Sequence, residues 1–173
     1  MSASFDIDRC IAHLNEVTGL HLTPDADHAV SFDYRNRSVL LRFLPDDQVC
    51  IAHIQLAELG SAALPEAPAL LLEDNFMLSN TGGGALSWSR ETRMVALNFF
   101  LPLAGADGDL FISRLNNMLA ASDEWVERIH EINAQALADT AERLSGLREG
   151  TAHHDPVHSL LSYFPIDAFE SGR

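Results

Sequence analysis

Residues 70–103 read LLLEDNFMLSNTGGGALSWSRETRMVALNFFLPL, and this stretch decides how the rest of the chain can be arranged. Residues 70–78 are predicted to form a helix with apolar side chains on nearly every side. A surface helix of a monomer shows one apolar stripe and one polar face. The predicted helix therefore needs two neighbours, its own sheet and a second partner. The residues that spread over more than half of its circumference are Leu71, Leu72, Asn75, Phe76 and Leu78.

The second part of the stretch predicts a hairpin. Asn80 and the glycines at 82–84 end the helix, because Asn and Gly accept the left-handed conformation found at helix ends. Leu86 and Trp88 then alternate with serines, which is the period of a strand. After a polar turn, residues 94–101 form a second strand that is apolar on both faces apart from Asn98. The stretch thus carries more apolar surface than one small domain should leave open.

The residues before this stretch predict one helix and a meander of three strands. Ser4 or Asp6 can cap the helix, and Gly19 lies at its expected end. Apolar residues at helical spacing follow the cap, namely Ile7, Cys10, Ile11, Leu14 and Val17. Alternating patterns then predict strands over 28–34, 38–44 and 48–56. The turns between them are short, so the strands are expected to pair antiparallel.

A long helix and a tail are predicted after the stretch. Asp107 or Asp109 caps the helix, which continues to Leu144 and is ended by Gly146 and Gly150. At 1.5 Å per residue it would measure ~54 Å, so its second half should project or fold back after a kink. We expect a domain over residues 1–147 and a flexible tail over 148–173. The element order, helix, three strands, helix, two strands, helix, predicts an α+β fold with a twisted, mainly antiparallel sheet.

Composition restricts the function classes. The net charge is −14 and the 173-residue chain has no Lys, which disfavours nucleic acids and anionic membrane surfaces as partners. No apolar run approaches the ~20 residues of a membrane span, and no signal peptide is visible. We therefore expect a cytoplasmic protein. Cys10 and Cys50 occupy apolar positions and are interpreted as buried free thiols.

The sequence holds no strong signal for catalysis or for a cofactor. No nucleophile elbow occurs, and the glycines at 82–84 lack the residues of a phosphate loop. His53 falls within a strand and is interpreted as a satisfied sheet residue. His153, His154 and His158 could form a weak metal site, but Pro156 interrupts them, so a polar tail is the favoured interpretation. We expect no metal, no cofactor and no enzymatic activity.

The ordered combination of these segments resembles the class I type III secretion chaperones, the Tir chaperone family. The resemblance is carried by Leu71, Leu72 and Asn75, followed by Leu97 and by Leu101, Pro102 and Leu103. It covers residues 5–132. It implies a homodimer in the bacterial cytoplasm that binds the extended N-terminal segment of a secreted effector without ATP.

The resemblance also implies site residues. Family dimers join through the second helix and the following strand, which implies an interface of Leu72, Phe76, Leu78, Leu86 and Trp88. Effector segments lie against the first helix and the neighbouring sheet, which implies contacts from Val17, Phe32, Tyr34, Leu41 and Phe43. The sequence does not separate core from groove among the second set. Three alternatives remain: a binder of the same fold that sequesters a transcriptional activator or anti-activator, an enzyme, and a purely structural dimerisation module.

Overall fold

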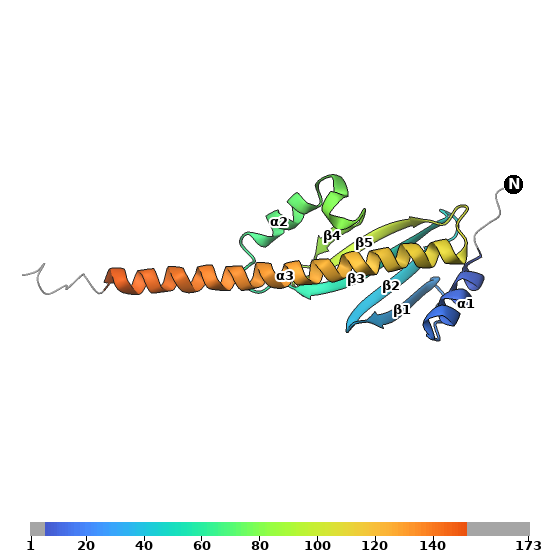
Figure 1. The fold of residues 1–173 in the computed structure, drawn as a ribbon, viewed down its shortest axis with the longest axis horizontal. Coiled ribbons are helices and arrows are strands. Elements are labelled where there is room, and N and C mark those ends of the chain that lie inside the picture. The colour runs from blue at the N-terminus through green and yellow to red at the C-terminus, as the bar shows by residue number, and fades with distance from the viewer. Residues whose placement is uncertain (1–5, 152–173) are drawn as a thin grey trace, which may run out of the picture. The chain divides into compact units, whose positions relative to one another are not determined.

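The computed structural model describes residues 6–151, apart from a few side chains, and Figure 1 shows the order of the elements. The chain divides into two compact units, residues 1–134 and 135–173. The helices and strands are α1 (Ile7–Thr18), β1 (Ala29–Tyr34), β2 (Arg37–Leu44), β3 (Val49–Glu58), α2 (Ala67–Asp74), the 3₁₀ helix η1 (Phe76–Thr81), β4 (Ala85–Trp88), β5 (Met94–Pro102) and α3 (Gly108–Thr151).

The first helix begins and ends where the sequence predicts. The Asp6 carboxylate accepts a hydrogen bond from the Arg9 backbone N–H at 3.0 Å, which satisfies one of the free donors at the helix start. Gly19 has φ of 72° and donates its N–H to the Asn15 carbonyl. A left-handed residue at this position favours glycine, which has no Cβ. The first helix is thus fixed by its two caps.

Five antiparallel strands form one sheet in the order β1-β2-β3-β5-β4, which confirms the predicted α+β fold. The short turns predicted from the sequence connect β1 to β2 and β2 to β3. The longer connection through α2 and η1 places β4 at the far edge, so that β5 returns beside β3. Strands β1 and β4 are therefore the two edges of the sheet.

One face of the sheet, the covered face, packs against α1 and the first part of α3 (Figure 1). In register across it lie Leu41, Ala52 and Phe99, and all three are buried. From α3, Phe111 lies with its ring centroid 5.8 Å from that of Phe43. Further buried residues of this core include Leu14, Val39, Ile54, Val95, Leu97, Leu101, Leu115, Met118 and Ile129.

Both predicted free thiols are buried in this core. Loss of hydration on burial disfavours the charged thiolate. Burial accordingly raises the pKa of the Cys10 thiol and of the Cys50 thiol to about 12. The two cysteines therefore pack as small apolar groups.

The predicted helix over 70–78 is wrong in its bounds. Helix α2 ends at Asp74, and the chain tightens into η1 from Phe76. The side chain of Asn75 explains the change, because it hydrogen-bonds the backbone of β4 and turns the chain at that point. Leu78 has a φ of 54°, a left-handed conformation that an apolar residue rarely adopts.

The predicted end of the last helix is also wrong. Helix α3 runs to Thr151 and includes Gly146. Glycine lowers helix propensity by about 1 kcal/mol relative to alanine, which weakens a long helix without breaking it. The predicted division at residue 147 concerns the tail, and it stays a prediction because residues 152–173 lie outside the described part.

Candidate functional site

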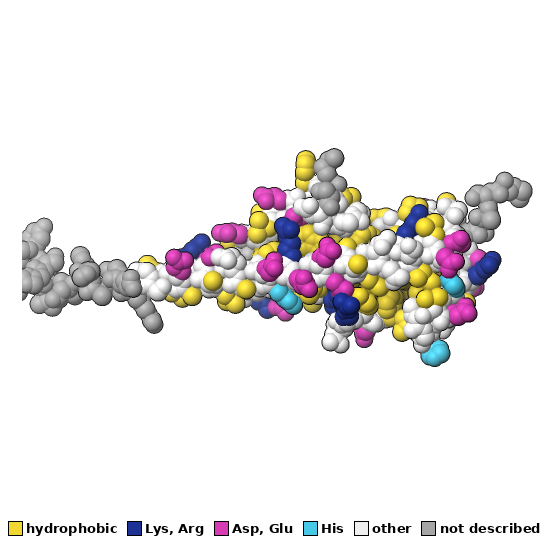
Figure 2. Space-filling model, in the orientation of Figure 1, with side chains coloured by type: hydrophobic (Ala, Val, Ile, Leu, Met, Phe, Trp, Pro, Cys, Tyr) yellow, Lys and Arg dark blue, Asp and Glu magenta, His cyan; other side chains and the backbone are white. Residues whose placement is uncertain are grey.

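An apolar ridge runs along α2 and η1, formed by Leu70, Leu72, Phe76 and Leu78. Leu72 and Phe76 keep 70% and 76% of their surface exposed. Figure 2 shows hydrophobic side chains at the surface in this part of the molecule. Contiguous exposed apolar side chains of this size mark interaction sites more often than ordinary surface. The ridge is therefore the first candidate surface.

Asn75 holds the centre of the ridge on the sheet. Its side-chain Oδ1 accepts the Leu86 N–H at 2.7 Å, and its Nδ2 donates to the Leu86 carbonyl at 3.0 Å. The amide thus pairs with β4 as a neighbouring strand would. This contact satisfies two backbone groups and fixes the point where α2 gives way to η1.

Asp74 ties the same segment to α3. Its buried carboxylate accepts hydrogen bonds from Asn80 at 2.9 Å and from Arg128 at 3.0 Å. The Arg128 guanidinium lies over the Trp125 ring, 5.1 Å from its centroid, and the Trp125 indole donates to the Asn80 carbonyl. Polar contacts therefore position the ridge, and its leucines and Phe76 are left at the surface.

Leu86 and Trp88, the other residues of the implied dimer interface, lie on β4. Leu86 is buried, and Trp88 is half-buried. The Trp88 Nε1–H is buried and has no hydrogen-bond acceptor among the described residues. Such a donor costs about 1–3 kcal/mol when it stays unsatisfied. It lies on the edge strand next to the segment that carries the ridge.

The implied effector-binding residues divide into three groups. Val17 is exposed on α1, and Phe32 is half-buried on the edge strand β1. Leu41 and Phe43 are fully buried beneath the helices, as part of the core. Tyr34 is half-buried and has a specific polar contact. The structure thus leaves Val17 and Phe32 accessible and places Leu41 and Phe43 out of reach.

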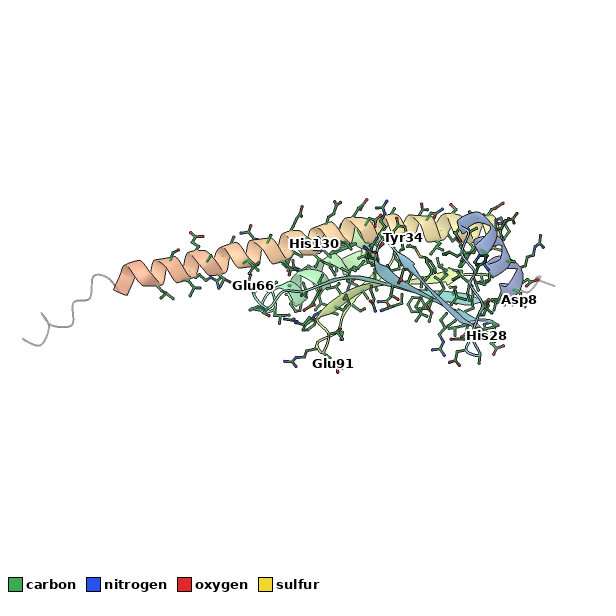
Figure 3. All side chains as sticks on the ribbon, turned by 90° about the horizontal axis from the view of Figure 1, so that it is seen from below. Asp8, His28, Tyr34, Glu66, Glu91 and His130 are labelled. Atoms are coloured by element: carbon green, nitrogen blue, oxygen red, sulfur yellow. The ribbon has the colours of Figure 1, made fainter. Side chains whose placement is uncertain are left out.

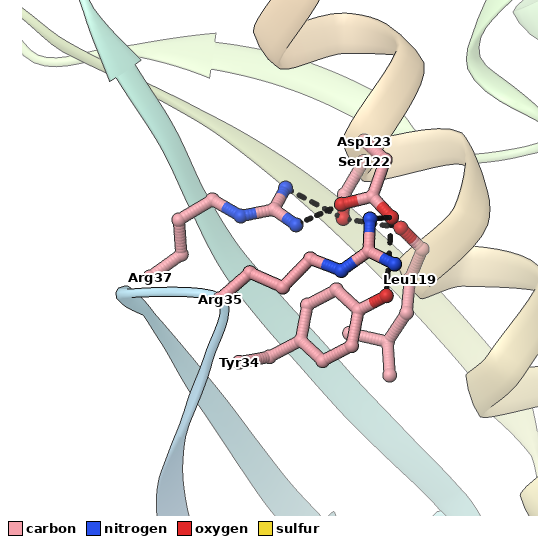
Figure 4. A network of polar contacts seen from close by, with 6 residues as sticks. All are labelled: Tyr34, Arg35, Arg37, Leu119, Ser122 and Asp123. Carbon is pink, nitrogen blue, oxygen red and sulfur yellow. Dashed lines mark hydrogen bonds and ion pairs between the residues drawn. The ribbon is translucent and has the colours of Figure 1, made fainter.

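Tyr34 belongs to a polar network that joins the β1–β2 turn to α3 (Figure 4). The Tyr34 hydroxyl and the Arg35 guanidinium both donate to Asp123 Oδ2, at 3.0 and 2.7 Å. Arg37 donates to Asp123 Oδ1 and to the Ser122 hydroxyl. Figure 3 shows Tyr34 beside α3. The network fixes the end of the edge strand β1.

Sequence reasoning missed this network and the Asp74 contacts. Asp123 lies 86 positions from Arg37, and Asp74 lies 54 positions from Arg128. The only local signal is the arginine-rich turn at 35–37, which is explained equally well as a solvated hairpin turn.

A groove of about 810 Å³ lies between α1 and the loop that leads into α3. Its lining includes Asp6, Glu16, Asp107 and Asp109, with Arg9 as the basic residue. His13 Nε2 lies 2.8 Å from Asp109 Oδ1 and links the two helices. The groove is acidic, in keeping with the charge of the whole chain.

The opposite face of the sheet, the open face, carries a smaller apolar patch. Phe100 is 68% exposed and lies in register with Ile51, and Leu40 is exposed nearby on β2. His53 beside them contacts Asn98 at 2.7 Å, which agrees with its interpretation as a satisfied sheet residue.

The described residues contain no group of three or more His, Cys, Asp or Glu side chains arranged to hold a metal ion. The predicted weak site at His153, His154 and His158 lies outside these residues. Within residues 6–151, no helix is both long enough and apolar enough to cross a membrane.

Comparison with known proteins gives one family and several solved structures of similar fold. A model of the Tir chaperone protein (CesT) family matches residues 9–126, more than half of the chain. No curated protein sequence matches it. Among solved structures, the ExsC–ExsE complex is similar with a TM-score of 0.58 and 17% identity, over 73% of this chain and 96% of that one.

Two further structures share the fold. The Yersinia pestis type III secretion chaperone SycH, in complex with a stable fragment of YscM2, gives a TM-score of 0.54 at 12% identity. That match covers 69% of this chain and 98% of the other. The HopA1–SchA chaperone–effector complex gives 0.53 at 13% identity, over 70% of this chain and 98% of the other.

Proposed function

The chain belongs to the Tir chaperone protein (CesT) family, and on this premise we propose that it is a type III secretion chaperone. It binds the N-terminal segment of a secreted effector in extended form and keeps that segment soluble and competent for secretion. The observation that carries the proposal is exposed apolar surface on a family fold with a net charge of −14. The charge keeps such a surface soluble.

The chaperone acts as a homodimer joined through the ridge and β4. Three observations support this part of the proposal. The ridge exposes large apolar side chains, polar contacts through Asp74 and Asn75 tie its backbone to α3 and β4, and the neighbouring Trp88 indole has no acceptor among the described residues. A second copy would cover the apolar side chains and could supply the acceptor.

The effector segment binds along α1 and the edge strand β1. Val17 and Phe32 offer accessible apolar contacts there, and β1 pairs with β2 on one side only within the described sheet. An extended chain can add a strand to such an edge and place alternate side chains on the apolar contacts. A folded partner keeps its apolar residues inside and has little to place there. Leu41 and Phe43 serve as core beneath this surface.

Charge sets a preference among partners. The acidic groove beside α1 favours effector segments that carry Lys or Arg next to their apolar anchors, because complementary charge speeds encounter and selects partners. The proposal places the protein in the bacterial cytoplasm, where effectors are made, and requires no ATP, metal or cofactor. SycH and SchA, which share the fold, are described in complexes with a YscM2 fragment and with HopA1.

Co-purification from the native bacterium, followed by mass spectrometry, tests the proposal. We expect a secreted protein whose N-terminal segment alone binds and whose remaining part does not. Capture of a transcriptional activator or anti-activator would instead support the second candidate, a regulator of the same fold. A partner that binds only through a folded domain would contradict both.

Light scattering tests the dimer. The wild type should have twice the chain mass, and Phe76→Glu should have one chain mass because a charge would be buried at the interface. Val17→Glu is the matched control, since it places the same charge on the other exposed apolar surface and should remain a dimer. A wild-type monomer at micromolar concentration would exclude the proposed interface.

A further inference from the structure

The C-terminal part of α3 carries an exposed apolar stripe of its own. This part, residues 135–151, lies beyond the residues matched by the family and belongs to the second compact unit. Leu137 and Leu144 are 64% and 58% exposed, and Leu147 is 67% exposed. Their spacing of seven and three puts them on one side of the helix. Figure 2 shows hydrophobic side chains along this part of α3.

The two hydroxyl residues near the stripe form hydrogen bonds within their own helix. Thr140 donates its hydroxyl hydrogen bond to the Ala136 carbonyl at 2.8 Å, and Ser145 donates to Ala141 and Glu142. These hydroxyls are therefore satisfied within the helix. Of the charged residues between the leucines, Asp139 accepts a hydrogen bond from Gln135, and Glu142 and Arg143 are exposed. Helices in proteins gain most of their stability from packing of an apolar face. Gly146 lowers the intrinsic helix propensity further. Packing of another apolar segment against the stripe would therefore stabilise this part of α3.

We propose that residues 157–169 of the same chain, the tail segment, cover this stripe. The tail segment reads VHSLLSYFPIDAF and contains Leu160, Leu161, Phe164 and Ile166. It follows the end of α3 after five residues that can span roughly 17 Å. The stripe from Leu137 to Leu147 is roughly 15 Å long. A chain that reverses near Pro156 can therefore place the tail segment along the stripe.

The size of the stripe favours this occupant over a second copy. Stable interfaces between separate proteins bury roughly 800 Å² on each partner. Three partly exposed leucines offer much less than that. A tethered segment needs less area, because its effective concentration near the stripe is on the order of millimolar.

Amide hydrogen exchange on the full-length protein, purified without a partner, tests the proposal. The variant Leu160→Glu/Phe164→Glu leaves α3 unchanged and disrupts the tail segment. We expect amides in residues 135–151 to exchange at least ~10-fold faster in this variant, at low and at high protein concentration alike. Ser171→Glu is the matched control, because it adds a charge to the tail outside the segment, and it should exchange as the wild type does. In a reciprocal variant, Leu144→Glu should speed exchange in residues 157–169.

Three results would overturn the proposal. Equal exchange in the wild type and the tail variant would show that the tail segment does not cover the stripe. Protection that increases with protein concentration would assign the stripe to a second copy. Protection that arises only after a bound partner is added would assign it to that partner. The first readout does not depend on the proposed chaperone function, so either proposal can fail alone.

Discussion

The covered face of the sheet and the ridge on α2 and η1 carry the same kinds of apolar side chain. These side chains are buried on the covered face and exposed on the ridge. On the covered face, each side chain contacts others from α1, α3 or the neighbouring strands, and burial fixes its position. On the ridge, Asp74 and Asn75 fix the backbone through polar contacts, and the apolar side chains remain exposed. Polar anchors therefore let a small domain present apolar surface without collapsing onto it.

The largest expected effect comes from two adjacent phenylalanines on β5. Phe99 is buried on the covered face, and Phe100 is 68% exposed on the open face. Phe99→Ala should lower the free energy of unfolding by about 3–5 kcal/mol, since it removes apolar burial and leaves a cavity. Phe100→Ala should change it by no more than about 0.5 kcal/mol. Denaturant unfolding of both variants measures the difference. Equal losses of unfolding free energy would show that the covered face and the open face contribute alike to stability.

Asp74 tests whether polar anchors hold the ridge. Asp74→Ala leaves the Asn80 amide without its acceptor and should cost about 1–3 kcal/mol of unfolding free energy. The neighbouring Glu73 is exposed, so Glu73→Ala is the control and should cost little. Thermal and denaturant unfolding report the two values. Equal stability of the two variants would mean that the ridge is held by other contacts.

Tyr34 separates a structural role from a binding role. Tyr34→Phe removes the hydroxyl that donates to Asp123 and keeps the ring near the Arg35 and Arg37 guanidiniums. We expect a loss of about 0.5–1.5 kcal/mol of unfolding free energy and unchanged partner binding. Unchanged stability together with weaker binding would instead make Tyr34 a direct contact of the effector.

The smallest expected effect at neutral pH concerns the cysteines. Burial raises the pKa of both thiols from 9.0 to about 12, so a thiol reagent at pH 7 should modify neither in the folded protein and both after unfolding. Because the folded pKa is the higher one, this contribution to stability is complete below pH 9 and is lost as pH rises toward 12. Rapid labelling of the native protein would show that the covered face opens.

Periodicity predicted most of the fold because helices and strands repeat their apolar positions locally. All five strands follow from such patterns. The caps follow from residue type, which predicted Gly19 and gave Asp6 as one of two candidates with Ser4. The change from α2 to η1 does not, because it depends on the contact of Asn75 with β4, eleven positions away. Gly146 and Gly150 misled the prediction of the end of α3, since the helix continues through both of them to Thr151.

The candidate site was harder to predict for a related reason. Alternation told which residues of β2 share a face, and it grouped Leu41 and Phe43 with Val39. It could not tell that α1 and α3 cover this face. Whether an apolar residue belongs to the core or to the surface depends on which element packs over it. Local alternation does not contain this information, because it is set by tertiary packing.

Hydrogen exchange on the chaperone co-purified with its partner tests the central claim, that an extended segment binds the accessible surface of α1 and β1. We expect the partner to be protected along a discontinuous stretch of its N-terminal region, with its other domains exchanging as they do in the free protein. The chaperone should gain protection in α1 and β1. Protection of a compact folded domain of the partner, with no binding by its N-terminal segment, would contradict the account.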